Sequence, residues 1–253
     1  MKHAVVTGAG SGIGAATAKR LARDGFRVGL LDLDGETAAA VEREIAASGG
    51  VAYSLELDVT DADGVTSAFE HARGIQADLS VLVNSAGIVA VDRFEDFSTE
   101  VWRRTYDVNV IGTYLAMVAA LPALRASEES ARVINVASAA AKRPGPFTAP
   151  YNASKAAVIS LSRTAAAAWA PEVLVNSVCP GLMDTPMWRD MDRRLEELRA
   201  GPGTSFADRV AELPIVRAGS AEEVAEVISS LAGPAGAYVV GEDLNVSGGL
   251  VMH

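Results

Sequence analysis

The 253-residue chain is poor in several residue types, and each shortage excludes a class of protein. Cys179 is the one cysteine, so an internal disulfide is impossible and a reducing compartment such as the cytoplasm is expected. The three histidines, His3, His71 and His253, lack the spacing of metal ligands. A zinc-dependent mechanism is therefore disfavoured, and no metal is expected.

Positive charge and long apolar runs are also scarce. The 22 lysines and arginines are outnumbered by 32 acidic residues, and the net charge of −10 argues against nucleic acid as a partner. The most apolar stretches, Tyr114 to Leu124 and Ala165 to Ala170, are too short to span a bilayer. No sustained apolar segment typical of a signal peptide follows the first strand, so neither export nor a membrane partner is expected.

Short apolar runs alternate with helical patterns along the chain. Strands are expected near Ala4–Thr7, Arg27–Leu31, Ala52–Leu57, Leu79–Val83, Val133–Val136, Leu174–Val178 and Asp243–Val246. Helices are expected near Gly12–Asp24, Gly35–Ser48, Ala62–Arg73, Tyr106–Leu124, Tyr151–Trp169 and Ala221–Leu231. The alternation predicts an α/β fold with a doubly wound parallel sheet of about seven strands and helices on both faces. No linker or repeat divides the chain, so residues 1–253 are expected to form one domain.

The alternation of strand and helix patterns is interrupted between residues 184 and 214, a charged segment that contains Gly201-Pro202-Gly203. Within this segment, Met187, Met191, Leu195 and Leu198 share one face of a helix-like stretch. An insertion after the carboxyl end of a strand often forms a lid, so residues 184–214 are expected to cover the substrate site. The alternative is an amphipathic helix that only packs on the body.

A glycine-rich turn, TGAGSGIG at Thr7 to Gly14, joins the first strand to the first helix. Gly8, Gly12 and Gly14 let the backbone approach a pyrophosphate, and the helix N-terminus supplies amide donors. A tight strand-to-helix turn also favours glycine, but the position at the first such junction favours dinucleotide binding.

Asp32 closes the second expected strand. A carboxylate there accepts hydrogen bonds from the adenosine ribose and repels a 2′-phosphate, and no lysine or arginine follows it directly. The cofactor is therefore expected to be NAD, with NADP less favoured. The alternative role of Asp32 is a helix N-cap, which Asp34 could equally supply.

Tyr151 and Lys155 lie four residues apart in YNASK, on one face of an expected helix, and the chain has only four lysines. A cation about 4 Å from a phenol, at an effective dielectric of about 20, contributes roughly 4 kcal/mol. This interaction would lower the pKa of the tyrosine toward working pH and make it a general acid and base. The alternative is an exposed helix face with a solvated lysine.

These motifs resemble those of the short-chain dehydrogenase/reductase family, which has a Rossmann-like fold. Further matches are Asp58 in LELDVTD, NSAG at Asn84 to Gly87, Asn109 in DVNVIG, Ser138 in INVASA and PGLMDTPM at Pro180 to Met187. NSAG departs from the usual NNAG by having Ser85 at its second position. The resemblance covers essentially the whole chain and implies an NAD-dependent oxidoreductase of secondary alcohols and ketones.

The resemblance also implies a role for each catalytic residue. Tyr151 exchanges the proton, Lys155 binds the nicotinamide ribose, Ser138 polarises the carbonyl, and Asn109 holds a relay water. Alone, Ser138 could be an ordinary residue at a strand end and Asn109 a structural asparagine. The expected cofactor-binding residues are Gly8, Ser11, Gly12, Ile13, Gly14, Asp32, Leu33, Asp58, Val59, Asn84, Ala86, Gly87, Tyr151, Lys155, Pro180, Gly181, Met183 and Thr185. The expected substrate residues are Ser138, Phe147, Tyr151, Met187 and Trp188.

The catalytic helix is apolar nearly all round, as is the long helix before it. Since the sheet covers one face only, a homo-oligomer is expected, and the resemblance implies a homotetramer. The wording of residues 185–195 resembles polyol and small-ketone reductases, which favours a small alcohol or ketone as substrate. Two alternatives are a 3-oxoacyl carrier-protein reductase, which Asp32 disfavours, and a non-catalytic dinucleotide sensor or scaffold, which the four catalytic residues disfavour.

Overall fold

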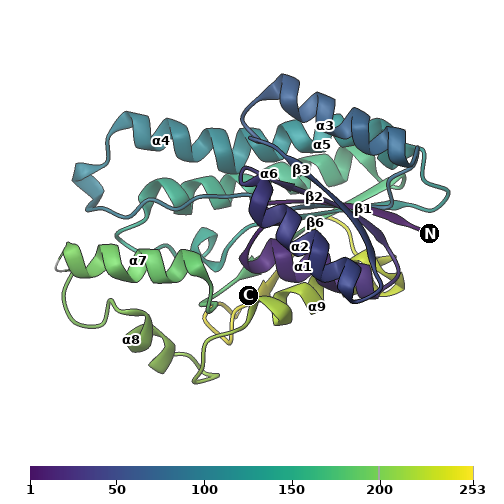
Figure 1. Ribbon diagram of the computed structural model, residues 1–253. Coiled ribbons are helices and arrows are strands. Elements are labelled where there is room, and N and C mark those ends of the chain that lie inside the picture. The colour runs from purple at the N-terminus through teal and green to yellow at the C-terminus, as the bar shows by residue number, and fades with distance from the viewer. Residues whose placement is uncertain (199, 253) are drawn as a thin grey trace.

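The computed structural model describes residues 1–198 and 200–252. Seven parallel strands form one sheet in the order β3-β2-β1-β4-β5-β6-β7 (Figure 1). The strands are β1 His3–Thr7, β2 Arg27–Asp32, β3 Val51–Glu56, β4 Val81–Asn84, β5 Ala131–Val136, β6 Val173–Pro180 and β7 Asp243–Val246. The predicted doubly wound sheet of seven strands is confirmed.

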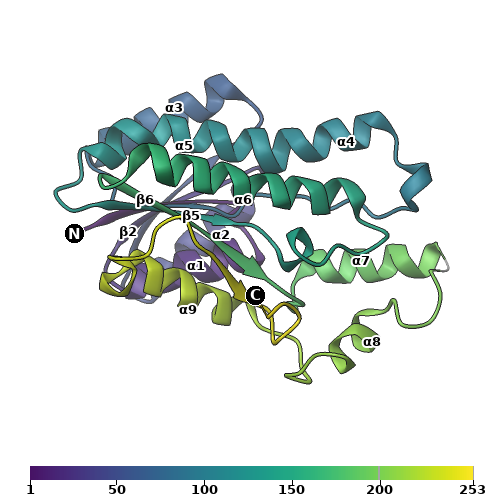
Figure 2. The same cartoon turned by 180° about the vertical axis from the view of Figure 1, so that it is seen from behind.

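Helices cover both faces of this sheet, as the two opposite views show (Figures 1 and 2). The helices are α1 Gly12–Arg23, α2 Gly35–Ala47, α3 Ala62–Ile75, α4 Thr99–Tyr106, α5 Gly112–Arg125, α6 Ala149–Trp169, α7 Pro186–Glu197, α8 Phe206–Ala211 and α9 Ala221–Ala232. Helices α1, α2 and α9 bury apolar side chains with Val6 on one face, whereas α3, α5 and α6 do so with Val5 on the other. The alternation of neighbouring strand residues thus builds two cores, one on each face.

The central strands of the sheet are buried more completely than the edge strands. Every residue of β1, β4, β5 and β6 is buried, so these segments read as continuous apolar runs. The edge strands β3 and β7 are only partly buried. Strand order reverses between β1 and β4, and in doubly wound sheets ligands bind at the carboxyl ends of the strands at this point.

The expected helix at Tyr106–Leu124 is part of a longer one. Ser98 caps α4 by accepting a hydrogen bond from the Val101 amide, and a π-helical turn, η2 Asp107–Ile111, joins α4 to α5. The continuous helix Thr99–Arg125 is long and apolar enough to cross a membrane by length and composition, although half of its most apolar window is buried in the fold. The shorter span expected from the sequence omitted the polar first turns, which are ordered by this cap.

The segment after β6 leaves the body of the molecule and carries α7 and α8, which lie at the end opposite the N-terminus (Figures 1 and 2). The helix-like stretch expected from Met187 onward is α7, whose Met191 and Leu195 are buried. At the base of the segment, Met183 and Gly219 form an isolated parallel bridge. The two ends of the segment that carries α7 and α8 are therefore held next to each other.

Candidate active site

A cavity of about 360 Å³ opens at the carboxyl ends of the central strands. Its first wall is the glycine turn, where Gly8 and Gly12 adopt φ values of 65° and 51°. A Cβ on Gly8 would lie 2.7 Å from the backbone of Ala86, so only glycine allows the ends of β1 and β4 to approach so closely. Ser11, the N-cap of α1, makes no side-chain hydrogen bond to the helix, which leaves the first amides of α1 free to bind an anion.

Gly14, expected to bind the cofactor, lies where the first helix meets the glycine turn. It does not line the cavity, and a Cβ there would lie 1.9 Å from the carbonyl oxygen of Gly8. The absence of a Cβ on Gly14 therefore lets α1 pack against its own turn.

Two carboxylates mark one end of the cavity. Asp32 accepts hydrogen bonds from the amides of Gly10 at 2.8 Å and Asp34 at 3.0 Å. The N-cap of α2 is Asp34, whose side chain accepts from the Glu36 and Thr37 amides. Since Asp34 fills the capping role, the Asp32 carboxylate remains at the cavity wall.

Asp58 is the second carboxylate at this end. It accepts from the amide of Thr60 at 2.9 Å and from its hydroxyl at 2.7 Å, and these bonds lower the pKa of Asp58. Arg104 lies 3.8 Å away, between Nη2 and Oδ2, and also lines the cavity. Arg104 was not expected from the sequence, because its position depends on the missed helix α4.

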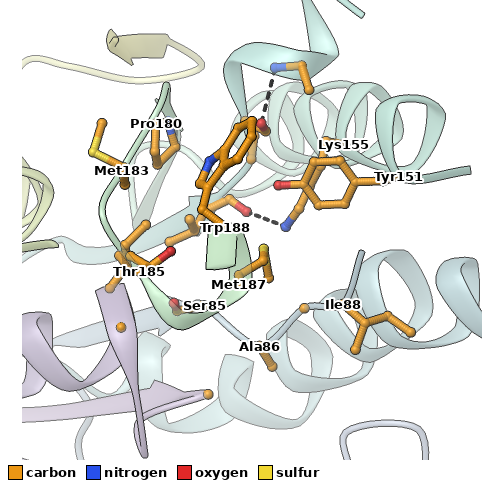
Figure 3. A pocket seen from close by; sticks show the side chains of 18 of the residues that line it. Ser85, Ala86, Ile88, Tyr151, Lys155, Pro180, Met183, Thr185, Met187 and Trp188 are labelled. Atoms are coloured by element: carbon orange, nitrogen blue, oxygen red, sulfur yellow. Dashed lines mark hydrogen bonds between the residues drawn. The ribbon is translucent and has the colours of Figure 1, made fainter. Parts of the chain in front are cut away.

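Tyr151 and Lys155 line the middle of the same cavity (Figure 3). Ser138 lines it as well. Lys155 is 5% exposed and donates from Nζ to the carbonyl oxygen of Val136 at 2.8 Å. Its Nζ lies 5.8 Å from the centre of the Tyr151 ring. The ammonium thus faces the tyrosine and the cavity, as the helical spacing predicted.

Charge in this part of the cavity is strongly affected by burial. Desolvation raises the pKa of Tyr151, although its interaction with the Ser138 hydroxyl opposes the rise. Desolvation also lowers the pKa of Lys155 to about 8. The expectation that Lys155 lowers the pKa of Tyr151 is therefore wrong for the protein without a bound cofactor. Burial removes water from both side chains and disfavours the charged form of each.

Asn109 is fully buried in the π-helical turn and adjoins the catalytic group without lining the cavity. Its Oδ1 accepts from the Ile88 amide at 2.8 Å, and its Nδ2 donates to the Ile88 carbonyl at 3.0 Å and the Ser154 hydroxyl at 2.9 Å. A Cβ on Gly87 would lie 3.2 Å from Asn109 Oδ1 and 3.3 Å from Lys155 Nζ. Both polar atoms therefore lie close to the same side of Gly87.

The far end of the cavity is formed by the segment between β6 and α9. Met187, Trp188 and Met191 of α7 contribute apolar surface, and Arg209 of α8 lies beside them. The rings of Trp188 and Phe206 are 5.1 Å apart, which fixes α8 against α7. Figure 3 shows Met187 and Trp188 close to Tyr151.

Most of the expected residues meet in this one cavity. The lining residues among them are Gly8, Ser11, Gly12, Ile13, Asp32, Leu33, Asp58, Val59, Ala86, Gly87, Ser138, Tyr151, Lys155, Pro180, Gly181, Met183, Thr185, Met187 and Trp188. Asn84 and Phe147 do not line it; the buried Asn84 amide instead donates to Asn135 at 2.8 Å. Lining residues that the sequence did not indicate include Ile88, Thr148, Arg209 and Leu250.

The arrangement defines a class of protein before any comparison is made. A doubly wound parallel sheet with a glycine turn at its switch point and an acidic residue after the second strand is typical of dinucleotide-binding enzymes. Among residues 1–198 and 200–252, no group of three or more histidine, cysteine or acidic side chains could hold a metal ion.

Comparison with known proteins identifies the family. A family profile for short chain dehydrogenases matches residues 2–196. A 3-oxoacyl-[acyl-carrier-protein] reductase of Synechocystis sp. is 38% identical over 98% of this chain and 96% of its own. L-2,3-Butanediol dehydrogenase of Corynebacterium glutamicum is 33% identical over 100% of this chain and 99% of its own.

Solved structures agree. The ligand-free aldohexose dehydrogenase of Thermoplasma acidophilum has a TM-score of 0.86 at 32% identity, covering 98% of this chain and 93% of its own. A blue fluorescent protein from a metagenomic library, solved with NADPH, has a TM-score of 0.86 at 31% identity, covering 99% of this chain and 98% of its own.

The chain belongs to the short-chain dehydrogenase family. It is accordingly an oxidoreductase that acts on substrates of the alcohol or ketone type, and its family binds a nicotinamide dinucleotide.

Proposed function

We propose that this protein transfers a hydride between NAD(H) and a secondary alcohol or ketone, with Tyr151 as the general acid and base. The observation that carries the proposal is the meeting of Tyr151, Lys155 and Ser138 on one cavity whose other end holds Asp32. A small ketone or alcohol fits the mostly apolar wall that α7 provides. The resemblance of residues 185–195 to polyol reductases keeps a polyol among the candidate substrates. The residues 184–214 would cover this substrate as a lid.

The residues present fit a nicotinamide dinucleotide. Gly8 and Gly12 have positive φ values that shape the turn, and the first amides of α1 behind it have no side-chain partner. Asp32 would hold the adenosine ribose, and Thr185 and Met183 would lie at the other end of the bound molecule. When bound, this group accepts or supplies the hydride.

Tyr151 would give its phenolic proton to the carbonyl oxygen in reduction and take a proton from the alcohol in oxidation. Its raised pKa keeps the phenol protonated, which suits the acid role. The Ser138 oxygen accepts from the Ala140 amide at 3.1 Å, and its hydroxyl interacts with Tyr151. Both groups would therefore face one substrate oxygen, where the Ser138 proton would stabilise the developing alkoxide.

Lys155 would bind ribose hydroxyls and transmit protons toward Tyr151. A water beside Gly87, between Asn109 Oδ1 and Lys155 Nζ, would continue the relay. The protons of Asn109 are already used on Ile88 and Ser154, so this water would donate to its oxygen.

We test the assignment with Tyr151→Phe, which should abolish turnover and leave NADH binding within about three-fold. Turnover by this variant would contradict the role of Tyr151. Fluorescence titration of the wild type with NADH and NADPH tests the cofactor, and tighter binding of NADPH would contradict the choice of NAD. That outcome is the one expected of a 3-oxoacyl carrier-protein reductase, the second candidate, which the Synechocystis relative supports.

We also propose a cytoplasmic homotetramer. Ile111, Tyr114 and Val118 are exposed apolar side chains on one side of the helix that runs through α5. Spacings of three and four residues place them on one stripe, which a second copy would bury. Light scattering should give four times the mass of the chain, and Tyr114→Glu should reduce that mass.

A further inference from the structure

Two arginines face the substrate end of the cavity. Arg143 follows the short η3 turn (Ala139–Ala141) that begins after Ser138, and Arg209 lies on α8. The surface around them is apolar and comes from Ala140, Met187, Trp188, Met191 and Leu250. Two cations against an apolar wall, next to the proposed acid, are an unusual choice for a neutral substrate.

Arg209 is held in a defined pose. Its guanidinium carbon lies 5.8 Å from the centre of the Trp188 ring, and Trp188 is itself packed on Phe206. A Cβ on Gly145 would lie 3.8 Å from both terminal nitrogens of Arg209, so the glycine leaves room beside the guanidinium. Stacking uses the face of a guanidinium and leaves its N–H edge available.

Neither arginine forms an ion pair within the described part of the chain, where no carboxylate lies within 4.0 Å of either. The neighbouring arginines of α7 differ: Arg189 pairs with Asp184 at 3.2 Å, and Arg193 with Asp190 at 2.8 Å. Arg143 donates to the carbonyl of Leu250 at 3.4 Å.

The two cations also affect each other. Burial is the largest cause that lowers the pKa of Arg209; Glu212 opposes this lowering, Arg143 adds to it by a smaller amount, and Asp192 opposes it. An anion placed between the two guanidinium groups would relieve this repulsion. The chain has a net charge of −10, so the positive charge of Arg143 and Arg209 is a local feature of this end of the cavity.

We propose that the substrate is a hydroxy acid or oxo acid whose carboxylate is bound by Arg143 and Arg209 while its alcohol or ketone carbon lies at Tyr151 and Ser138. This inference rests on the proposed function and names its substrate class. A carboxylate has two oxygens and matches the fork of an arginine. The apolar side chains around the pair offer no further donors, so the two guanidinium groups alone would bind the anion.

The test compares each acid with its own methyl ester in NAD⁺ reduction. 3-Hydroxybutyrate, 3-hydroxyhexanoate and 4-hydroxycyclohexanecarboxylate are the probes. The best acid should exceed its ester in kcat/KM by at least about 30-fold, because hydrogen bonds to a charged group are strong. Arg209→Met and Arg143→Met should each lower kcat/KM for the acid by about 10- to 100-fold and change that for the ester less than three-fold.

Arg189→Met is the matched control, since it removes an exposed, paired arginine from the same segment and should change neither substrate. Esters that equal the acids, or variants that lose both substrates equally, would overturn the proposal. Turnover of acetoacetyl-CoA with NADH that is insensitive to both arginine variants would overturn it in favour of an acyl thioester substrate.

A binding arm separates this proposal from the proposed function. Cyclohexanecarboxylate and cyclohexylmethanol are titrated by calorimetry into the protein with saturating NADH. Tighter binding of the acid, lost in Arg209→Met, supports the anion site even if no alcohol in the panel is oxidised. Absence of turnover with every alcohol would count against the proposed function, whereas equal binding of the two compounds would count against the anion site.

Discussion

The carboxylate of Asp32 accepts a hydrogen bond from the amide of Gly10 at 2.8 Å, which ties the end of β2 to the glycine turn. A Cβ on Gly10 would lie 3.0 Å from the same carboxylate, so the two groups are in close contact. The Asp32 carboxylate is therefore held in one position on the cavity wall, next to the glycine turn.

Replacing this carboxylate should change cofactor choice. Asp32→Ser removes an acceptor for ribose hydroxyls and a charge that repels a 2′-phosphate, so Kd for NADH should rise about 10- to 100-fold. The Kd for NADPH should fall at least several-fold in fluorescence titrations. Asp34→Ser is the control, because it removes the same charge two residues away and keeps a good helix N-cap. A preference unchanged by Asp32→Ser would contradict the role of Asp32.

The buried ammonium of Lys155 should lower the free energy of unfolding of the protein, although the proposed reaction needs this group. Its pKa of about 8, against 10.5 ordinarily, means that folding disfavours the ammonium. Because its folded pKa is depressed, stability rises as pH increases from about 8 to 10.5, where the folded protein has released this proton and the unfolded chain has not. Lys155→Met should therefore be inactive but more stable at pH 7 by on the order of 1–2 kcal/mol in urea unfolding, after allowance for the lost bond to Val136. The advantage should shrink above pH 8.

Lys142→Met is the contrasting variant. Lys142 is also largely buried, but its Nζ lies 2.6 Å from Asp243 Oδ2 and 2.8 Å from Asn245 Oδ1. Removal of a paired buried lysine should destabilise the protein by about 1–3 kcal/mol. Equal effects of the two substitutions would show that pairing does not distinguish these lysines.

Asp243 should contribute to stability against acid. Burial alone would raise its pKa, but Lys142 and Arg163 outweigh that effect, and its pKa is lowered. A depressed pKa means stabilisation that is present above the ordinary value of 3.8 and is lost as pH falls through the folded value. Asp243→Asn should therefore be less stable than the wild type at pH 7, and the difference should narrow below about pH 4 in urea unfolding. A constant difference would contradict this origin.

Two glycines offer a matched test of packing. Gly14→Ala would place a Cβ 1.9 Å from the Gly8 carbonyl, so it should distort the turn, lower Tm and weaken NADH binding. Gly74→Ala, in α3 with nothing within 4 Å of its Cβ position, should instead stabilise the helix by about 0.5–1 kcal/mol. Thermal unfolding with a cofactor titration of both variants measures the contrast.

The sequence was sufficient for the fold because buried parallel strands read as apolar runs and their helices as periodic patterns. It was insufficient for α4, whose polar first turns depend on the Ser98 cap, and for the six-residue α8. Arg209 could not be found, because its position depends on α8 packing on Trp188.

Gly8, Gly12 and the Tyr151–Lys155 pair line the cavity that their motifs led us to expect, because backbone geometry alone sets their position, and their roles stay predictions. Asn84 was misplaced, because a strand end points neighbouring side chains to opposite faces and the motif does not tell which faces the cavity. The direction of the Tyr151 pKa was also missed, because desolvation depends on tertiary packing that no spacing reports.

The parallel bridge between Met183 and Gly219 has a consequence for how such enzymes diversify. Because Met183 and Gly219 hold the two ends of residues 184–218 together, a relative could carry a different sequence between these two positions without a change in the sheet. The proton-transferring residues on α6 would be unchanged by such an exchange, whereas the choice of the molecule being oxidised would change with residues 184–218.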